Sequence, residues 1–292
     1  MTNIHAGNIG LGKETIIQLA QHKPARIYLG ARNASKAQDA IASIQETLPS
    51  PADIRHVPLD LASFKSIRAA AAQFTAECDR LDILVLNAGT MANPPTKTDD
   101  GYEVQFGTNH MGHFLLTKLL LPTLQKTVTA GPGAGADNDV RVVVLSSVGH
   151  MTTPSFEVMT STEALLGVDT WTRYGASKAA NILFAAELAR RYPEILSVSV
   201  HPGAVASNLY EHVKASGVVS RLGVAAVSLT LRSVQSGALN QLWAAGADRK
   251  QLVNGAYYVP VGNYSKSRVD GDPELARKLW EWTDEQVSAT DS

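Results

Sequence analysis

The sequence predicts an α/β protein of one domain, in which helices cover both faces of a parallel β-sheet in a doubly wound arrangement. Three observations support this prediction. Short apolar segments alternate with amphipathic helical segments along the chain. The segments 81–86 and 140–146 are almost entirely apolar, which is typical of strands covered on both sides. A chain of 292 residues with 45% hydrophobic content can bury one sizeable core, and no linker divides it.

The first third of the chain alternates helix and strand after a glycine-rich start. Helices are predicted at 13–22, at 35–47 and after Ser63, a residue that can cap a helix. Their apolar faces are Ile16, Ile17, Leu19 and Ala20 in the first helix, Ala37, Ala40, Ile41 and Ile44 in the second, and Phe64, Ile67, Ala71 and Phe74 in the third. The segments 25–30, 54–59 and 81–86 read as the strands of this region.

The rest of the chain continues the alternation. Strands are expected at 140–146, 196–201 and 256–260, and helices at 102–127, 174–191, between 222 and 245, and 272–287. Asp272 as cap and Pro273 in the first turn mark the start of the last helix. The low-complexity stretch 129–139 predicts a surface loop.

Composition excludes several classes of partner and site. The formal net charge is -1 without long runs of one sign, so neither a nucleic acid nor an anionic membrane surface is expected to bind. Cys78 is the one cysteine, which excludes an internal disulfide. His110 and His113 lack further ligands nearby in sequence, so no metal is expected. With no apolar segment long enough to span a membrane and no signal peptide, we expect a cytoplasmic protein.

Three turns at predicted strand or helix ends suit a nucleotide. Gly7, Gly10 and Gly12 precede a helix whose N-terminus favours a pyrophosphate, although glycines there can also form a plain turn. The segments Asp60-Leu61 and Asn87-Ala88-Gly89 each follow a strand, where ligands of open α/β sheets bind. The alternative for the second of these is a simple strand-ending turn.

Tyr174 and Lys178 form the sharpest candidate for chemistry. Four residues apart on a helix, they share one face. A phenol has a pKa of ~10, and a neighbouring ammonium group lowers it toward neutrality, where it can exchange a proton with a carbonyl oxygen. Taken alone, such a pair is more typical of a helix surface than of a catalytic site. Ser146 and Ser147 at the end of strand 140–146, and Asn109 among apolar neighbours, strengthen the catalytic interpretation.

The motifs together resemble those of the short-chain dehydrogenase/reductase family, and most closely its retinol-dehydrogenase-like branch. The matching segments are 7–12, 30–33, 60–63, 87–89, 108–114, 145–147, 174–178, 201–205 and 279–282. The resemblance implies a Rossmann-like fold in which Tyr174 donates or accepts the proton. It also implies that Lys178 lowers the pKa of Tyr174 and binds the nicotinamide ribose, that Ser147 orients the carbonyl, and that Asn109 holds a water linked to Lys178.

The resemblance further implies a set of cofactor-binding residues. Those near the phosphates would be Gly7, Asn8, Gly10, Leu11 and Gly12. Those near the adenosine would be Asp60, Leu61, Asn87, Ala88 and Gly89, and those near the nicotinamide would be Tyr174, Lys178, Pro202, Gly203, Val205 and Ser207.

Arg32 favours NADP over NAD as the cofactor. It follows the second strand, where chains that bind NAD commonly carry a carboxylate for the ribose hydroxyls. A guanidinium group instead suits a 2′-phosphate. The alternative is that Arg32 is a solvated loop residue.

The N-terminus departs from the family pattern T-G-x-x-x-G-x-G. His5 and Ala6 stand where the threonine and the first glycine belong, and the preceding strand is shortened. Each buried backbone group left unpaired beside it costs ~1–3 kcal/mol. Either residues 2–5 form a short strand and the enzyme works with reduced stability, or the start is replaced or mis-assigned. The second case allows an impaired or non-catalytic regulatory relative, against which the retention of the four catalytic candidates argues.

The segments beside the predicted active site indicate a class of substrate, and two helices indicate a mode of assembly. Residues 149–173 and 205–235 should border the substrate, a small lipophilic carbonyl or alcohol. Their apolar members are Met151, Phe156, Met159, Trp171, Leu209, Tyr210 and Val213, for which ordinary loop packing is the alternative. The helices 102–127 and 174–191 resemble those that pair subunits in the family, which allows a homodimer.

Overall fold

Eight strands of the described residues form one continuous sheet in the order β3-β2-β1-β4-β5-β6-β7-β8. The computed structural model describes residues 2–5, 7–130, 139–205, 232–269 and 271–289. The pairs from β3 to β7 are parallel, and β8 joins β7 in antiparallel fashion. The strands are β1 (Thr2–His5), β2 (Ile27–Ala31), β3 (Ile54–Pro58), β4 (Ile83–Leu86), β5 (Arg141–Leu145), β6 (Leu196–Val200), β7 (Tyr257–Val259) and β8 (Asn263–Tyr264).

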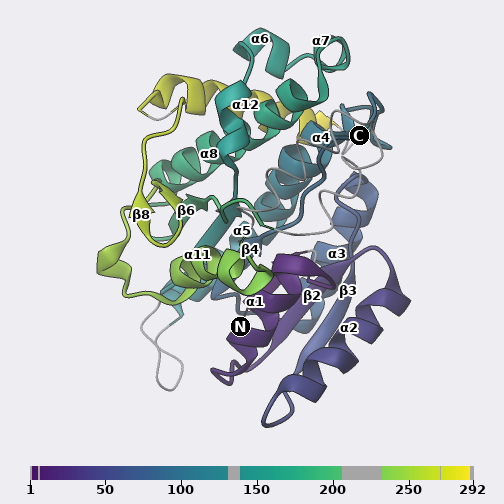
Figure 1. The fold of residues 1–292 in the computed structure, drawn as a ribbon, viewed down its shortest axis with the longest axis vertical. Coiled ribbons are helices and arrows are strands. Elements are labelled where there is room, and N and C mark those ends of the chain that lie inside the picture. The colour runs from purple at the N-terminus through teal and green to yellow at the C-terminus, as the bar shows by residue number, and fades with distance from the viewer. Residues whose placement is uncertain (1, 6, 131–138, 206–231, 270, 290–292) are drawn as a thin grey trace.

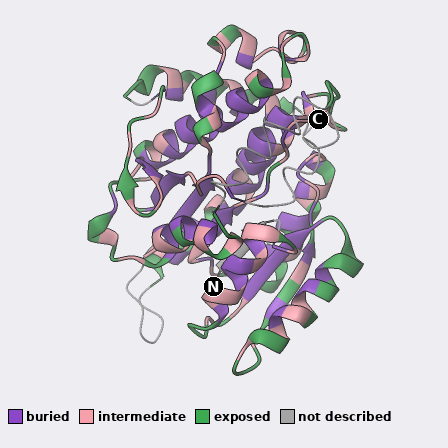
Figure 2. Ribbon diagram, in the orientation of Figure 1, coloured by how far each residue is buried: buried purple, intermediate pink, exposed green. Residues whose placement is uncertain are grey.

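Helices cover both faces of the sheet, so the predicted doubly wound fold is confirmed (Figure 1). One apolar core lies beneath α3 (Phe64–Glu77), α5 (Gly112–Thr129), α8 (Thr170–Arg191) and α12 (Pro273–Ser288). The other lies beneath α1 (Gly10–Ala20), α2 (Ala34–Thr47) and α11 (Val234–Gly246). The buried residues concentrate in the strands and in the inner faces of these helices (Figure 2).

The short first strand lies at the centre of the sheet. Its residues pair with β2 from Thr2 to His5 and with β4 from Thr2 to Ile4. The backbone of both neighbours therefore finds ladder partners along this stretch. This agrees with the interpretation in which residues 2–5 form a short strand.

The helix expected over 102–127 is divided into three parts. It begins with the single turn α4 (Val104–Phe106), continues as the π-helical turn η1 (Gly107–Met111) and then becomes α5. A Cβ on Gly112 would overlap the backbone of Leu61, so α5 starts in direct contact with the loop after β3. The wider turn of η1 carries Asn109, and such turns are frequent at functional sites.

The chain between β5 and α8 forms short helices. These are the 3₁₀ helix η2 (Val148–Thr152), α6 (Phe156–Met159) and α7 (Thr162–Leu166). α8 begins at Thr170, before the predicted start at 174, because Asp169 caps it by accepting bonds from the N–H groups of Trp171 and Thr172. Tyr174 thus lies inside the helix, in its second turn.

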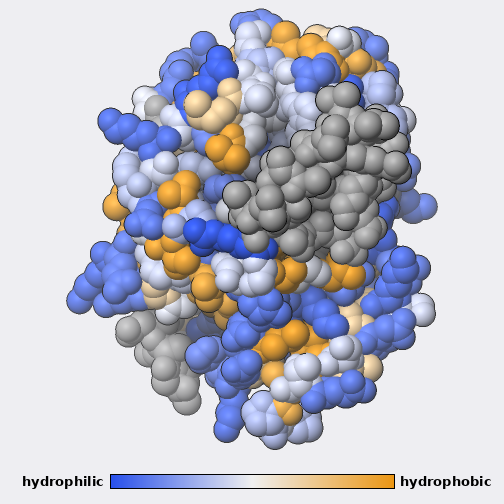
Figure 3. Space-filling model, viewed as in Figure 1, coloured by the Kyte–Doolittle hydropathy of each residue, from blue (hydrophilic) through white to orange (hydrophobic). Residues whose placement is uncertain are grey.

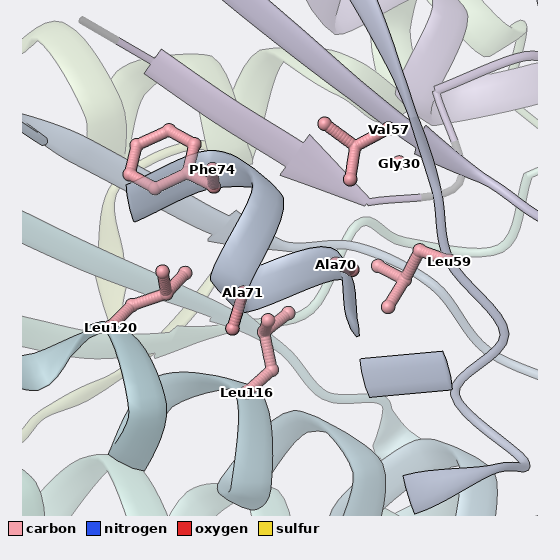
Figure 4. A pocket seen from close by; sticks show the side chains of 8 residues that line it. All are labelled: Gly30, Val57, Leu59, Ala70, Ala71, Phe74, Leu116 and Leu120. Carbon is pink, nitrogen blue, oxygen red and sulfur yellow. The ribbon is translucent and has the colours of Figure 1, made fainter. Parts of the chain in front are cut away.

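A small apolar cavity of about 10 Å³ lies between the sheet and the helices α3 and α5 (Figure 4). Its lining consists of Gly30, Val57, Leu59, Ala70, Ala71, Phe74, Leu116 and Leu120. It is barely large enough for one water, and its wall offers no polar side chain to hold it. We interpret it as a packing gap rather than a binding site.

Candidate active site

The predicted catalytic residues meet at the carboxyl end of β5. Lys178 Nζ on α8 donates to the carbonyl of Leu145, 3.1 Å away, at the last position of that strand. Ser146 Oγ returns a 2.7 Å hydrogen bond to the carbonyl of Lys178. Lys178 Nζ lies 5.7 Å from the centroid of the Tyr174 ring. Two hydrogen bonds therefore connect the helix that carries Tyr174 and Lys178 to the end of β5, the strand that leads to Ser147.

Gly149 brings Ser147 and Tyr174 together. Its N–H donates to Ser147 Oγ at 3.1 Å. A Cβ at Gly149 would lie 2.8 Å from Tyr174 Cε1 and 3.5 Å from Ser147 Oγ, so the ring packs directly on this backbone. A Cβ at Gly175 would likewise overlap Thr152. These glycines, which sequence reasoning did not single out, let η2 and α8 approach closely enough to form the site.

Asn109 connects the turn after β4 to α8. Its Oδ1 accepts from the N–H of Thr90 at 2.8 Å, and its Nδ2 donates to Thr90 O and Ser177 Oγ, each at 2.9 Å. A Cβ on Gly89 would lie 3.4 Å from both Asn109 Oδ1 and Lys178 Nζ. The buried amide thus fixes the turn that ends in Gly89 beside the ammonium group.

A buried ion pair between α8 and the residue before α4 stabilises the same loop after β4. Glu103 and Arg173 lie 3.1 Å apart with side chains 0% and 4% exposed. Arg173 also donates to the carbonyl of Asn93 at 2.7 Å, and Gln105 accepts from the N–H of Ala92 at 3.0 Å. The loop after β4 is therefore bound to α4 and to the start of α8, a network that the sequence analysis did not anticipate.

Burial controls the charge of Lys178. The side chain is almost fully buried, and this lowers its pKa from 10.5 to about 8. At neutral pH most of the molecules still carry the ammonium charge. A positive group next to the Tyr174 ring favours the phenolate form.

The start of α1 fits a phosphate group. Its N-cap is Ile9, whose side chain makes no capping bond, so the N-cap residue does not satisfy the first N–H groups. Gly10 has a positive φ of 54°. Gly7 and Gly12 are buried, and a Cβ on Gly7 would overlap Ile16. Asn8 is half-buried, and Leu11 packs partly buried against the core of α1, α2 and α11.

Arg32 lies where the sequence placed it, just after β2. Its side chain is 75% exposed, and Nη1 lies 3.9 Å from Asp60 Oδ2. Asp60 also accepts from the N–H of Ala62 at 3.0 Å, while Leu61 is buried. An extended guanidinium at this edge can reach an anionic group outside the sheet.

The turn after β6 closes the opposite side of the site. Gly203 has a φ of 87°, and a Cβ there would lie 3.1 Å from Arg232 Cδ. Pro202 is half-buried, and Val205 forms a parallel bridge with Arg232. Ser207, Leu209, Tyr210 and Val213 lie outside the described residues.

Two adjacent amides on α11 connect α1 with the carboxyl ends of β4, β6 and β7, and sequence reasoning missed them. Asn240 Nδ2 donates to the carbonyls of His201 at 2.8 Å and Tyr258 at 3.1 Å. Gln241 Nε2 donates to Thr15 on α1 and, at 3.3 Å, to Asn87 Oδ1. Ala88 beside Asn87 is buried. Two adjacent polar residues within the apolar stretch 237–246 were the signal that could have found them.

The predicted substrate wall is only partly formed by the expected residues. Met151 and Trp171 are 53% and 45% exposed beside the catalytic turn, and Val148 joins them at 60%. Met159 belongs instead to the core, and Phe156 packs against it. For Met159 and Phe156 the alternative of ordinary packing therefore applies.

Two further findings concern the described residues as a set. None of their helices is long and apolar enough to cross a membrane, and they contain no group of three possible metal ligands. The described surface in Figure 3 is a mosaic of hydrophilic side chains and separate apolar patches.

The comparison with known proteins identifies the family. Residues 3–158 match the family model for short chain dehydrogenases. The chain belongs to this family. A short-chain dehydrogenase/reductase from Armillaria gallica is 36% identical over 287 residues, which cover 97% of this chain and 88% of the relative. Retinol dehydrogenase 12 from Mus musculus is 36% identical over 281 residues, covering 95% and 83%.

A solved structure agrees with the short-chain dehydrogenase fold. An uncharacterized protein from Mycobacterium paratuberculosis matches with a TM-score of 0.73 and 28% identity, over 98% of this chain and 92% of that one. The resemblance stated from the motifs is thus confirmed. The protein is an oxidoreductase of a family that binds nicotinamide cofactors.

Proposed function

We propose that this protein is an NADP(H)-dependent oxidoreductase that transfers hydride between the nicotinamide and a lipophilic carbonyl or alcohol. The observation that carries the proposal is the meeting of Asn109, Ser147, Tyr174 and Lys178 around Gly89 and Gly149. Four polar side chains from three elements converge there, although packing alone does not require them.

In the proposed reduction, Tyr174 donates its phenolic proton to the substrate oxygen. Ser147 Oγ accepts from Gly149 N–H, which leaves its own hydrogen free to bind the same substrate oxygen. Lys178 carries the positive charge that stabilises the phenolate left behind. When bound, the nicotinamide supplies or accepts the hydride. Asn109 would hold the turn after β4 on one side of the nicotinamide. The start of α1 would hold the phosphates on the other side.

The role of Tyr174 is tested by Tyr174→Phe, which removes the proton donor and keeps the ring against Gly149. We expect kcat for NADPH-dependent reduction of lipophilic aldehydes and ketones to fall by about 10²–10⁴-fold. NADPH binding, measured by fluorescence titration, should change little. Turnover equal to that of the wild type would contradict the proposal.

The choice of NADP is tested by Arg32→Ala. The exposed guanidinium is placed to bind a 2′-phosphate, and charged hydrogen bonds contribute ~1.5–3 kcal/mol. We expect KM for NADPH to rise about 10- to 100-fold, with KM for NADH unchanged. Equal effects on both cofactors would show that Arg32 does not select between them.

The substrate class is inferred from the exposed apolar side chains beside the catalytic turn. Val148, Met151 and Trp171 present apolar surface within a few residues of Ser147 and Tyr174 in sequence. Lipophilic carbonyl compounds should bury that surface and bind better than polar ones of the same size. A series of aldehydes of increasing chain length would test this through kcat/KM.

A further inference from the structure

A buried histidine follows the catalytic serine and has no part in the chemistry above. His150 is 3% exposed and lies in η2. Its Nδ1 lies 2.7 Å from the carbonyl oxygen of Ser147, and its backbone N–H donates to the same oxygen at 3.0 Å. A carbonyl oxygen can only accept, so Nδ1 must carry the proton. In the neutral ring, Nε2 is then an acceptor.

Tyr257 on β7 lies against this ring from the sheet side. The two ring centroids are 5.1 Å apart and the rings meet edge to face at 76°. Tyr257 is 2% exposed. Within the described part of the chain, neither His150 Nε2 nor Tyr257 Oη has a hydrogen-bond partner. An acceptor and a donor thus lie close together in a buried place, where each unpaired group costs ~1–3 kcal/mol.

We propose that His150 and Tyr257 are positioning residues for Ser147. His150 Nδ1–H holds the Ser147 carbonyl, and Tyr257 Oη donates to His150 Nε2 through one buried water. The hydroxyl thereby fixes the tautomer that the contact with Ser147 requires. This inference rests on the proposed function, since it gives a role to the turn that presents Ser147 Oγ.

The surrounding contacts explain why the carbonyl of Ser147 matters. Ser147 Oγ is oriented by the N–H of Gly149, and Gly149 packs against the Tyr174 ring. A shift of η2 would therefore move Ser147 Oγ relative to the phenol. The two bonds to Ser147 O fix the pitch of this turn.

The charge state of the pair agrees with this role. Burial lowers the pKa of His150 and raises that of Tyr257, so both side chains are neutral at neutral pH. The other ionisable groups near them are Tyr174, His201 and Arg232. None of these is a carboxylate that would draw a second proton onto His150.

Two substitutions of His150 separate its ring nitrogens. In His150→Asn the amide N–H can replace Nδ1–H, whereas in His150→Gln the amide reaches the position of Nε2. We expect H150Q to lower kcat by about 10-fold or more while the Kd for NADPH stays the same, because a misplaced group slows the reaction rather than binding. H150N should restore most of the loss. Ile44→Val on α2 serves as a destabilised control far from the site.

Tyr257→Phe tests the second contact. We expect a smaller loss of kcat in the wild-type background and no further loss in the H150N background, where Nε2 is absent. Equal kcat for H150Q and the wild type, or losses in H150N and H150Q that follow the melting temperature alone, would overturn the proposal.

The tautomer of His150 can be measured by ¹⁵N NMR without turnover. We expect a protonated Nδ1 and a bare Nε2 in the wild type. A protonated Nε2 would overturn the contact with Ser147 while leaving the proposed function standing. Absence of any NADPH-dependent turnover in the wild type would instead overturn the proposed function, and with it the catalytic role of the pair.

Discussion

At the level of single residues, the positive charge of Lys178 serves the proposed chemistry and reduces the stability of the fold. Its ammonium group is buried, with Leu145 O as acceptor at 3.1 Å. Burial lowers its pKa from 10.5 to about 8, so folding disfavours the charged form. The associated loss of stability is complete below pH 8 and disappears as the pH rises toward 10.5.

Lys178→Met should therefore stabilise the protein while it abolishes turnover. We expect the free energy of unfolding at pH 7 to increase by ~1–3 kcal/mol, because an apolar side chain has no such desolvation cost. The gain should shrink as the pH approaches 10. Urea unfolding at both pH values measures it, and a less stable variant at pH 7 would contradict this view of the site.

At the scale of elements, α12 joins parts of the chain that lie far apart in sequence. Trp280 contacts Phe114 on α5 with ring centroids 4.8 Å apart and stacks on Phe184 of α8 at 5.8 Å. Thr283 bonds His110 at 3.1 Å. The helix therefore covers part of the surface of the two helices that resemble the subunit-pairing helices of the family. A homodimer formed through the uncovered part of these two helices stays a prediction.

Trp280→Ala should destabilise the fold more than it affects the site. Removing a partly buried tryptophan from this aromatic cluster is expected to cost ~2–4 kcal/mol. Thermal unfolding measures the loss, and KM for NADPH at low temperature should remain unchanged. Trp171→Ala on the exposed rim is the matched control, for which no comparable loss of stability is expected.

The elements also show how far sequence reasoning extends. Alternating apolar segments predicted β2 to β7 and the helices between them, because burial on both faces of a parallel sheet leaves a clear pattern. The pattern could not reveal the π-helical turn at Asn109, which depends on how α5 meets Leu61. It also missed Gly149 and Gly175, whose role arises only where η2 contacts α8.

At the scale of the whole molecule, buried neutral histidines link stability to pH. Burial lowers the pKa of His110 to about 3 and, with help from His150 and Arg232, that of His201 to about 4. Burial also lowers the pKa of His150. Below pH 6.5 the unfolded chain binds protons that the folded chain does not. The contribution of these neutral histidines to stability is therefore complete above pH 6.5 and is lost as the pH falls toward 4.

We expect the melting temperature to decline between pH 7 and pH 5. Each of these histidines contributes up to ~1.4 kcal/mol per pH unit to the slope. His110→Gln should reduce the slope, since a side chain that does not titrate replaces the most deeply buried ring. A melting temperature that is constant over this range would show that these histidines are not kept neutral by the fold.

The complete fold brings together the site residues that the sequence predicted and others that it did not. Tyr174, Lys178, Ser147 and Asn109 were found because their order along the chain resembles the family, and the fold brings them to one edge of the sheet. The network behind them could not be found this way. Glu103–Arg173 and Asn240–Gln241 join segments whose proximity exists only in the folded chain.

The proposed proton transfer requires a phenol whose acidity is raised by a buried ammonium group. Ultraviolet difference titration of the wild type, with Tyr174→Phe subtracted, measures the pKa of Tyr174 directly. We predict a value clearly below the ~10 of a free phenol in the wild type and a higher one in Lys178→Met. A Tyr174 pKa of ~10 or above that Lys178→Met leaves unchanged would contradict the proposed mechanism.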